Sequence, residues 1–257
     1  CYADYESDTD ALYDDSLLFD IPELNALFFR EGQTFNTIIT RSAHLSYVYN
    51  EVLSHYGLKK YPEYRGLTGN EETDCALLKA RLVDDFFARL LQELEARGQL
   101  QDTVIIGVTD HYTYGYKDME SLLELSGVKE TLLLEKTPCF IWSADIPPMT
   151  VNKTANTSDL LPTLLNLLGI DSKYQYLGRD IFDPNYVGYA FFADGSWASE
   201  GVMCKKNITD DQSEVTVIQN KYGKSIDDAW IHTTTDAAQE FTFISNLLLI
   251  SDYYRKP

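Results

Sequence analysis

The sequence predicts an α/β fold with a mostly parallel central sheet, and three observations support this. Residues 103–108, apolar or β-branched except for Gly107, form the most strand-like run of the chain. A long amphipathic helix is expected over residues 71–97, directly before this strand. A second β-branched run, residues 34–40, precedes the helix. Strand, helix and strand joined by short connections are typical of a parallel α/β sheet.

The remaining expected elements follow in order along the chain. A short helix covers residues 21–30, with Pro22 in its first turn and Gly32 as a stop signal after it. Later elements are expected as a helix at 121–135 interrupted near Gly127, a strand at 137–143, a helix at 158–168, paired strands at 190–193 and 201–204 around Asp194-Gly195, a strand at 214–218 and an acidic helix from about 225.

One continuous domain is the simplest account of this order. Residues 1–192 form its main part, and residues 193–257 form a small appended region of sheet and helix within the same domain. We find no internal repeat and no low-complexity segment that would suggest another organisation.

The composition is that of a globular and strongly acidic protein. The chain has 257 residues, 44% of them hydrophobic, and a formal net charge of −19. This charge argues against nucleic acid as a partner and against direct adsorption to an anionic bilayer. An anionic substrate would therefore need positive charge supplied locally, by a metal ion or by a few placed cations.

The beginning of the chain is crowded with aspartates and tyrosines. Asp8, Asp10, Asp14 and Asp15 lie within the first 20 residues. They lack the spacing and the glycine of an EF-hand calcium loop. We therefore interpret them as a solvated acidic segment.

The predicted central strand ends in the adjacent pair Asp110 and His111. A buried parallel strand delivers the residues that follow it to the carboxyl edge of the sheet, where ligands bind. A carboxylate beside an imidazole can coordinate one divalent cation there. The alternative interpretation is that Asp110 simply caps the next segment.

Six segments match, in order and at suitable spacing, the sequence of one protein family. Ser42-Ala-His44-Leu-Ser-Tyr47 matches a Ser-Gly-His-x-Pro-Tyr loop, and Asp110-His-Tyr112 matches an Asp-His-Tyr metal motif. The six segments are residues 35–47, 82–98, 102–112, 158–170, 177–182 and 192–197. Together they resemble the lipoteichoic-acid-synthase type of sulfatase-like phosphoglycerol transferases, in the alkaline-phosphatase-like superfamily.

The chain departs from this family pattern at several positions. Thr109 and Ala43 stand where glycine is usual, and Ser46 stands where proline is usual. We identify neither the nucleophilic threonine nor the second acidic metal ligand of the family, so no catalytic residue is assigned. The resemblance therefore implies the carboxyl-terminal half of a catalytic domain, inactive in isolation, which is stable as a homo-oligomer or together with the other half.

The resemblance implies an alkaline-phosphatase-like sandwich fold and one particular reaction. It implies transfer of phosphoglycerol from phosphatidylglycerol to a cell-surface glycerophosphate polymer. Asp110 and His111 would bind one divalent metal ion, Mn²⁺ or Mg²⁺ in preference to Zn²⁺, and His44 would bind substrate. The partners would be a phospholipid head group and the polymer, at the extracellular face of the bacterial membrane, with anchoring helices upstream of this chain.

Three other functions remain open from the sequence. A sulfatase or phosphodiesterase would use Asp110 and His111 but release its group to water. A phosphoethanolamine transferase would differ mainly in its contacts with the lipid head group. A non-catalytic cell-surface module would have lost the site, and His44 would then be a histidine hydrogen-bonded within a polar loop.

Overall fold

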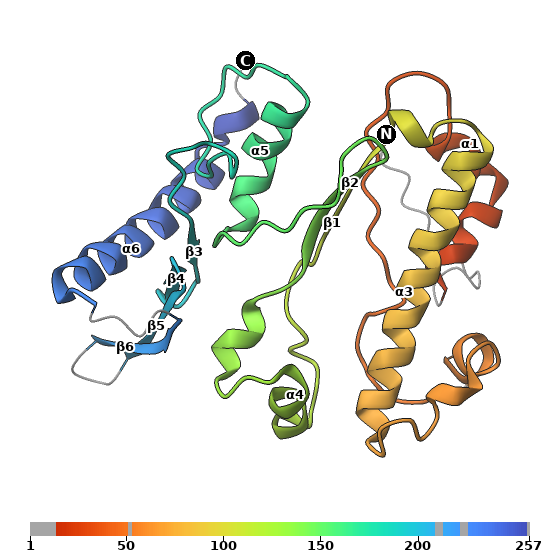
Figure 1. The fold of residues 1–257 in the computed structure, drawn as a ribbon, viewed down its shortest axis with the longest axis horizontal. Helices are drawn as coiled ribbons and strands as arrows, with labels where there is room; N and C mark the ends of the chain where they lie inside the picture. The colour runs from red at the N-terminus through yellow and green to blue at the C-terminus, as the bar shows by residue number, and fades with distance from the viewer. Residues whose placement is uncertain (1–13, 51–52, 209–212, 222–225, 256–257) are drawn as a thin grey trace. The chain divides into compact units, whose positions relative to one another are not determined.

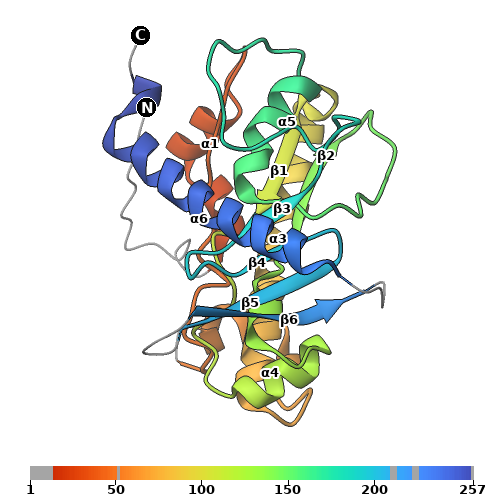
Figure 2. The same ribbon diagram turned by 90° about the vertical axis from the view of Figure 1, so that its left-hand side faces the viewer.

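The computed structural model describes residues 14–50, 53–208, 213–221 and 226–255 (Figures 1 and 2). The chain divides into two compact units, residues 1–148 and residues 149–257. The sequence predicts one domain with a main part, residues 1–192, and an appended region, residues 193–257. This division stays a prediction.

Helix α3, Glu71–Ala96, is the central element of the first unit and confirms the long amphipathic helix. It begins at Asn70, whose side chain accepts a hydrogen bond from the backbone N–H of Thr73. Acidic side chains in its first turn complement the helix dipole. The helix ends before Gly98, which has a φ of 67° that favours glycine.

The apolar face of α3 contributes to two hydrophobic clusters. Leu78 and Leu82 belong to the first cluster, and Phe86 and Leu94 belong to the second. The other buried members of the first cluster are Tyr47, Leu53, Cys75, Tyr116 and Leu122. The second cluster is completed by Phe19 and Phe29, the latter directly after helix α1, Pro22–Phe28. Helix α3 is therefore the support against which the loops of this unit pack.

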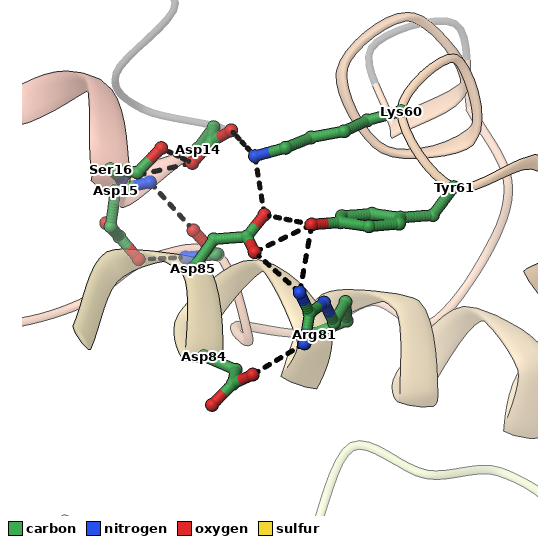
Figure 3. A network of polar contacts seen from close by, with 9 residues as sticks. Asp14, Asp15, Ser16, Lys60, Tyr61, Arg81, Asp84 and Asp85 are labelled. Carbon is green, nitrogen blue, oxygen red and sulfur yellow. Dashed lines mark hydrogen bonds and ion pairs between the residues drawn. The ribbon is translucent and has the colours of Figure 1, made fainter. Parts of the chain in front are cut away.

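A polar network ties the start of the described chain to α3 (Figure 3). The ammonium of Lys60 lies 2.5 Å from a carboxylate oxygen of Asp85 on α3 and 3.7 Å from one of Asp14. The Tyr61 hydroxyl donates to the Asp85 carboxylate at 2.7 Å, and Arg81 lies 3.2 Å from it. Burial would lower the pKa of Lys60, but its hydrogen bond to Asp85 and the charge of Asp14 outweigh burial and raise it.

Among the described residues the strands of the first unit are antiparallel, which corrects the expectation of a mostly parallel central sheet. Strand β1, Val104–Val108, pairs with β2, Cys139–Ser143, so that Val104 lies opposite Ser143 and Val108 opposite Cys139. The connection between them contains α4, Met119–Ser126, whose Leu122 packs into the α3 cluster. The chain returns beside the end of β1, where Cys139 lies opposite Val108, and so makes no crossover to a parallel neighbour.

Residues 34–40 do not form the predicted strand. The segment has no strand pairing among the described residues, and its Phe35 and Ile39 side chains are 87% and 79% exposed. The β-branched composition is therefore not sufficient for a strand here, because pairing depends on neighbours that the composition of one segment does not identify.

The second unit combines an antiparallel sheet with a long helix. The sheet contains β3 (Tyr189–Phe191), β4 (Trp197–Ser199), β5 (Val202–Ile208) and β6 (Ser213–Asn220) in that order. Helix α6, Asp228–Ile250, contacts β3 and β4 (Figure 2), and α5, Leu160–Leu167, precedes the sheet. The turn at Asp194-Gly195 joins β3 to β4, so the expected pairing of 190–193 with 201–204 is corrected by one strand.

Trp197 is the centre of the hydrophobic cluster of the second unit. Its side chain is fully buried, with Val202, Cys204 and Ala238 as the other buried members of the cluster. The indole Nε1 donates to the hydroxyl oxygen of Thr235 on α6 at 2.9 Å.

Within the described part of the chain, none of the helices is both long and apolar enough to cross a membrane.

Replacement of Asp74 should destabilise the first unit in a pH-dependent way. Asp74 is 1% exposed, and its carboxylate accepts from the Thr68 backbone N–H and hydroxyl at 2.7 and 2.6 Å. Burial raises the pKa of Asp74, but hydrogen bonds from Thr68, Gly66 and Leu67 outweigh it and hold the pKa below its usual value. We expect Asp74→Asn to lower the free energy of unfolding by about 1–3 kcal/mol at pH 7.

The sign of the pH dependence follows from the lowered pKa. A carboxyl with a lowered pKa in the folded state stabilises the fold above its unfolded pKa of about 3.9. This stabilisation disappears as the pH falls through the folded pKa, so urea titrations should show wild type and variant converging in acid. Asp84→Asn is the control, because the Asp84 side chain is 69% exposed on the same helix. An equal loss in both variants would contradict the role of Asp74.

Removal of the Thr235 hydroxyl should destabilise the second unit. Thr235→Val leaves the buried Trp197 indole N–H without its acceptor, which should cost about 1–3 kcal/mol in the free energy of unfolding. Thr233→Val is the matched control, since Thr233 is exposed and its hydroxyl donates to the Ala229 carbonyl in the same helix. Trp fluorescence during denaturation measures both, and similar midpoints for the two variants would refute the assignment.

Candidate metal and substrate site

Asp110 and His111 lie side by side in the loop that follows β1. A carboxylate oxygen of Asp110 is 3.4 Å from Nε2 of His111. The Asp110 side chain is 82% exposed and the His111 side chain is 41% exposed. The two side chains singled out by the sequence are therefore adjacent and open to solvent.

The backbone fixes which nitrogen of His111 faces Asp110. Nδ1 of His111 is 2.7 Å from the carbonyl oxygen of Tyr112. A carbonyl oxygen only accepts, so Nδ1 carries the hydrogen and the lone pair of the neutral ring is on Nε2. The Tyr114 ring, with its centroid 4.5 Å from that of His111, lies against the imidazole. The available lone pair therefore lies on the side of the Asp110 carboxylate.

A buried carboxylate positions the loop that carries His44. The Asp15 carboxylate accepts from the backbone N–H groups of Arg41 at 2.9 Å and Ser42 at 2.8 Å. The Ser42 hydroxyl accepts in return from the Asp15 N–H at 2.9 Å. The backbone N–H of His44 donates to the Arg41 carbonyl at 2.9 Å, which closes a turn. Nδ1 of His44 then bonds the Leu45 carbonyl at 2.8 Å, in the same way as His111.

Helix α3 holds the His44 loop and the Asp110 loop through different side chains. The Lys79 ammonium donates to the His44 carbonyl. The Glu72 carboxylate accepts from the backbone N–H groups of Lys117 at 2.8 Å and Asp118 at 2.9 Å. One face of α3 therefore anchors the backbone at His44 and the end of the loop after β1.

The two loops also touch each other directly. A side chain at Gly115 would place its Cβ only 2.9 Å from Cβ of Leu45, so glycine permits this close approach. The ring centroids of Tyr47 and Tyr116 are 5.8 Å apart in the cluster on α3. The loop after β1 thus packs against the residue that follows His44.

The donor atoms of the Asp110-His111 pair fit a single divalent cation. Adjacent ligand atoms around an ion with bonds of about 2.1 Å lie roughly 3.0–3.4 Å apart, which includes the 3.4 Å observed here. The Thr109 hydroxyl oxygen beside them is buried and has no hydrogen-bond partner in the described part of the chain. The pair would supply two ligands, and no group of three or more His, Cys, Asp or Glu side chains gathers among the described residues. Water or further side chains would complete the coordination.

Four residues with structural contacts in this unit were not identified from the sequence, and three of them, Asp15, Glu72 and Lys79, support the two loops. Asp14 and Asp15 were expected in a solvated acidic segment, but they are 5% and 1% exposed, whereas Asp8 and Asp10 lie outside the described residues. Glu72 and Lys79 were seen only as members of a helix. Their contacts join positions 35 or more residues apart, so no local pattern identifies them.

Comparisons with known proteins show which family the chain resembles. A model of the sulfatase family matches residues 10–170. The chain is 28% identical over 167 residues to a lipoteichoic acid synthase of Staphylococcus saprophyticus, which covers 59% of this chain and 25% of that protein. It is 25% identical over 251 residues to lipoteichoic acid synthase 2 of Bacillus subtilis, which covers 87% of this chain and 36% of that protein. The chain therefore spans about a quarter to a third of the length of these relatives.

The fold has a counterpart among solved structures. The crystal structure of the lipoteichoic acid synthase LtaP from Listeria monocytogenes matches with a TM-score of 0.55 and 19% identity, over 70% of this chain and 46% of that chain. This likeness confirms the expected α/β, alkaline-phosphatase-like fold. Since the family model covers more than half of its residues, the chain belongs to the sulfatase family and is similar to the lipoteichoic acid synthases within it.

Proposed function

We propose that this chain supplies the metal-binding and head-group-binding loops of a phosphoglycerol transferase. The reaction would move phosphoglycerol from phosphatidylglycerol to a glycerophosphate polymer at the extracellular face of the membrane. The observation that carries the proposal is the Asp110-His111 pair, held by α3 in a loop that packs against the His44 loop. The similarity to lipoteichoic acid synthases supports the choice of substrate class.

The residues of this chain would divide the work of binding. Asp110 and His111 would hold a divalent ion, Mn²⁺ or Mg²⁺, through the carboxylate and Nε2. When bound, the ion supplies positive charge that neutralises phosphoryl oxygens and activates a coordinated hydroxyl. His44 would contact the phosphate or a glycerol hydroxyl through its Nε2, because its Nδ1 is engaged with the Leu45 carbonyl. The nucleophile is not assigned to any residue of this chain, and self-association of the chain stays a prediction.

Loss of either proposed ligand should weaken binding of Mn²⁺. We expect one ion per chain for wild type, and an affinity reduced about tenfold or more in Asp110→Ala and in His111→Ala, because each removes a donor atom. Titration followed by the electron paramagnetic resonance signal of free Mn²⁺ measures this. His232→Ala, which removes an exposed histidine of α6, is the control and should bind as wild type does. Unchanged affinity in both ligand variants would refute the proposed metal site and favour a non-catalytic module.

Activity in membranes of cells that produce the whole protein should depend on His44 and Asp110. With fluorescent phosphatidylglycerol, release of diacylglycerol should fall at least tenfold in His44→Ala and in Asp110→Ala, since each loses a charge-assisted contact with phosphate or metal. Asp171→Asn, an exposed aspartate of the second unit, should retain activity. Incorporation of labelled glycerophosphate into polymer supports a transferase, and its accumulation as a free product indicates a hydrolase. Turnover of phosphatidylethanolamine alone would contradict the proposed donor.

A further inference from the structure

Lys79 is a partly buried cation whose hydrogen-bond and ring partners carry no negative charge. Its ammonium donates to the His44 backbone carbonyl and lies 5.8 Å from the centroid of the Tyr47 ring. Within the described residues it makes no ion pair. Other cations on or near the same helix do pair with carboxylates, and these are Lys60, Arg81, Arg89 and Arg97.

Among the residues that the structure describes, Lys79 has no counter-charge, although the chain is strongly acidic. The sequence has 40 Asp and Glu against 21 Lys and Arg, so carboxylates are abundant. Burial lowers the pKa of Lys79, and the opposing effect of the neighbouring Cys75 thiol does not cancel it. Withdrawing a charge from water without a partner is costly, so the position favours an anionic ligand that is supplied from outside the chain.

The ammonium of Lys79 has unused hydrogen-bonding capacity. A lysine carries three N–H donors, and the His44 carbonyl takes one of them. The His44 loop is fixed on its other side by the buried Asp15 carboxylate. The cation is therefore held at a defined place beside His44, with donors left for a ligand.

We propose that Lys79 is a further anion-binding residue of this site, and that it acts together with His44 on the phosphate group of a phosphate ester. The inference deepens the proposed function, because it assigns a protein cation to the substrate phosphate. Lysine is well suited to this, since its ammonium acts as a point charge toward phosphate oxygens. The ester could be a phospholipid head group or a soluble glycerophosphate, and the two share this chemistry.

The test is a titration of the metal-free chain, in the presence of EDTA, with glycerol phosphate. Nuclear magnetic resonance would follow the His44 ring and the Lys79 side chain, and both sets of resonances should move in wild type. Lys79→Gln should weaken binding about tenfold or more, because it removes a charge-assisted bond. Lys79→Arg keeps the charge and should remain within about threefold of wild type. Wild-type resonances of His44 and Lys79 that do not respond would overturn the proposal without any variant.

A matched control lysine lies in the second unit. Lys153 donates to the Ile181 carbonyl at 2.7 Å and lies 5.5 Å from the centroid of the Tyr186 ring, so it has the same kinds of partner as Lys79. Lys153→Gln should bind glycerol phosphate as wild type does. An equal loss in Lys153→Gln and Lys79→Gln would show a general effect of charge and overturn the assignment.

Two further measurements complete the test. One distinguishes a phospholipid head group from a soluble phosphate ester as the ligand, and the other distinguishes the Lys79 proposal from the metal-site proposal. Vesicles that contain phosphatidylglycerol should compete with glycerol phosphate if the head group is the ligand, and only the soluble ester should bind if it is not. Equal binding of both by wild type and Lys79→Gln would overturn the proposal. The Mn²⁺ titration reports on Asp110 and His111, whereas the titration in EDTA reports on His44 and Lys79, so failure of the first and failure of the second can be told apart.

Discussion

Hydrogen bonds from one helix to two loops are the interactions on which the candidate site depends. Glu72 and Lys79 are seven residues apart, two turns of α3, and therefore lie on the same side of the helix. Glu72 accepts from backbone N–H groups after the Asp110-His111 pair, and Lys79 donates to the backbone beside His44. Both loops are exposed and contain little regular structure. Their geometry therefore follows from the rigidity of α3 and from its burial against two apolar clusters.

The acidic character of the chain has a structural use beyond net charge. Several buried carboxylates accept hydrogen bonds from backbone N–H groups of loops. Asp15 bonds residues 41 and 42, Asp74 bonds Thr68, and Asp159 bonds Arg179 in the second unit. A carboxylate that accepts such bonds holds a loop firmly in one conformation, because charge-assisted hydrogen bonds are roughly twice as strong as neutral ones. Acidic residues thus order irregular segments that contain few apolar side chains.

The parts of this structure that local patterns predict are those that local interactions determine. The four-residue spacing of leucines and phenylalanines predicts α3, and the strand-like run before Asp110 predicts β1. The antiparallel direction of β2 and the lack of a strand at residues 34–40 depend on pairing with distant segments, which local patterns do not encode. Asp15 and Lys79 support the His44 loop through contacts between residues far apart in sequence. Local composition therefore predicts an exposed Asp15, which is in fact buried, and predicts no role for Lys79.

The two histidines of the region share one local arrangement. In each, Nδ1 bonds the backbone carbonyl of the next residue, Leu45 for His44 and Tyr112 for His111. The rings are thereby locked in the same tautomer, with Nε2 directed away from the backbone. Electrophilic reagents would consequently meet one nucleophilic nitrogen on each ring. Alkylation of these imidazoles should therefore favour Nε2, whereas a histidine free to exchange between its tautomers would react at both nitrogens.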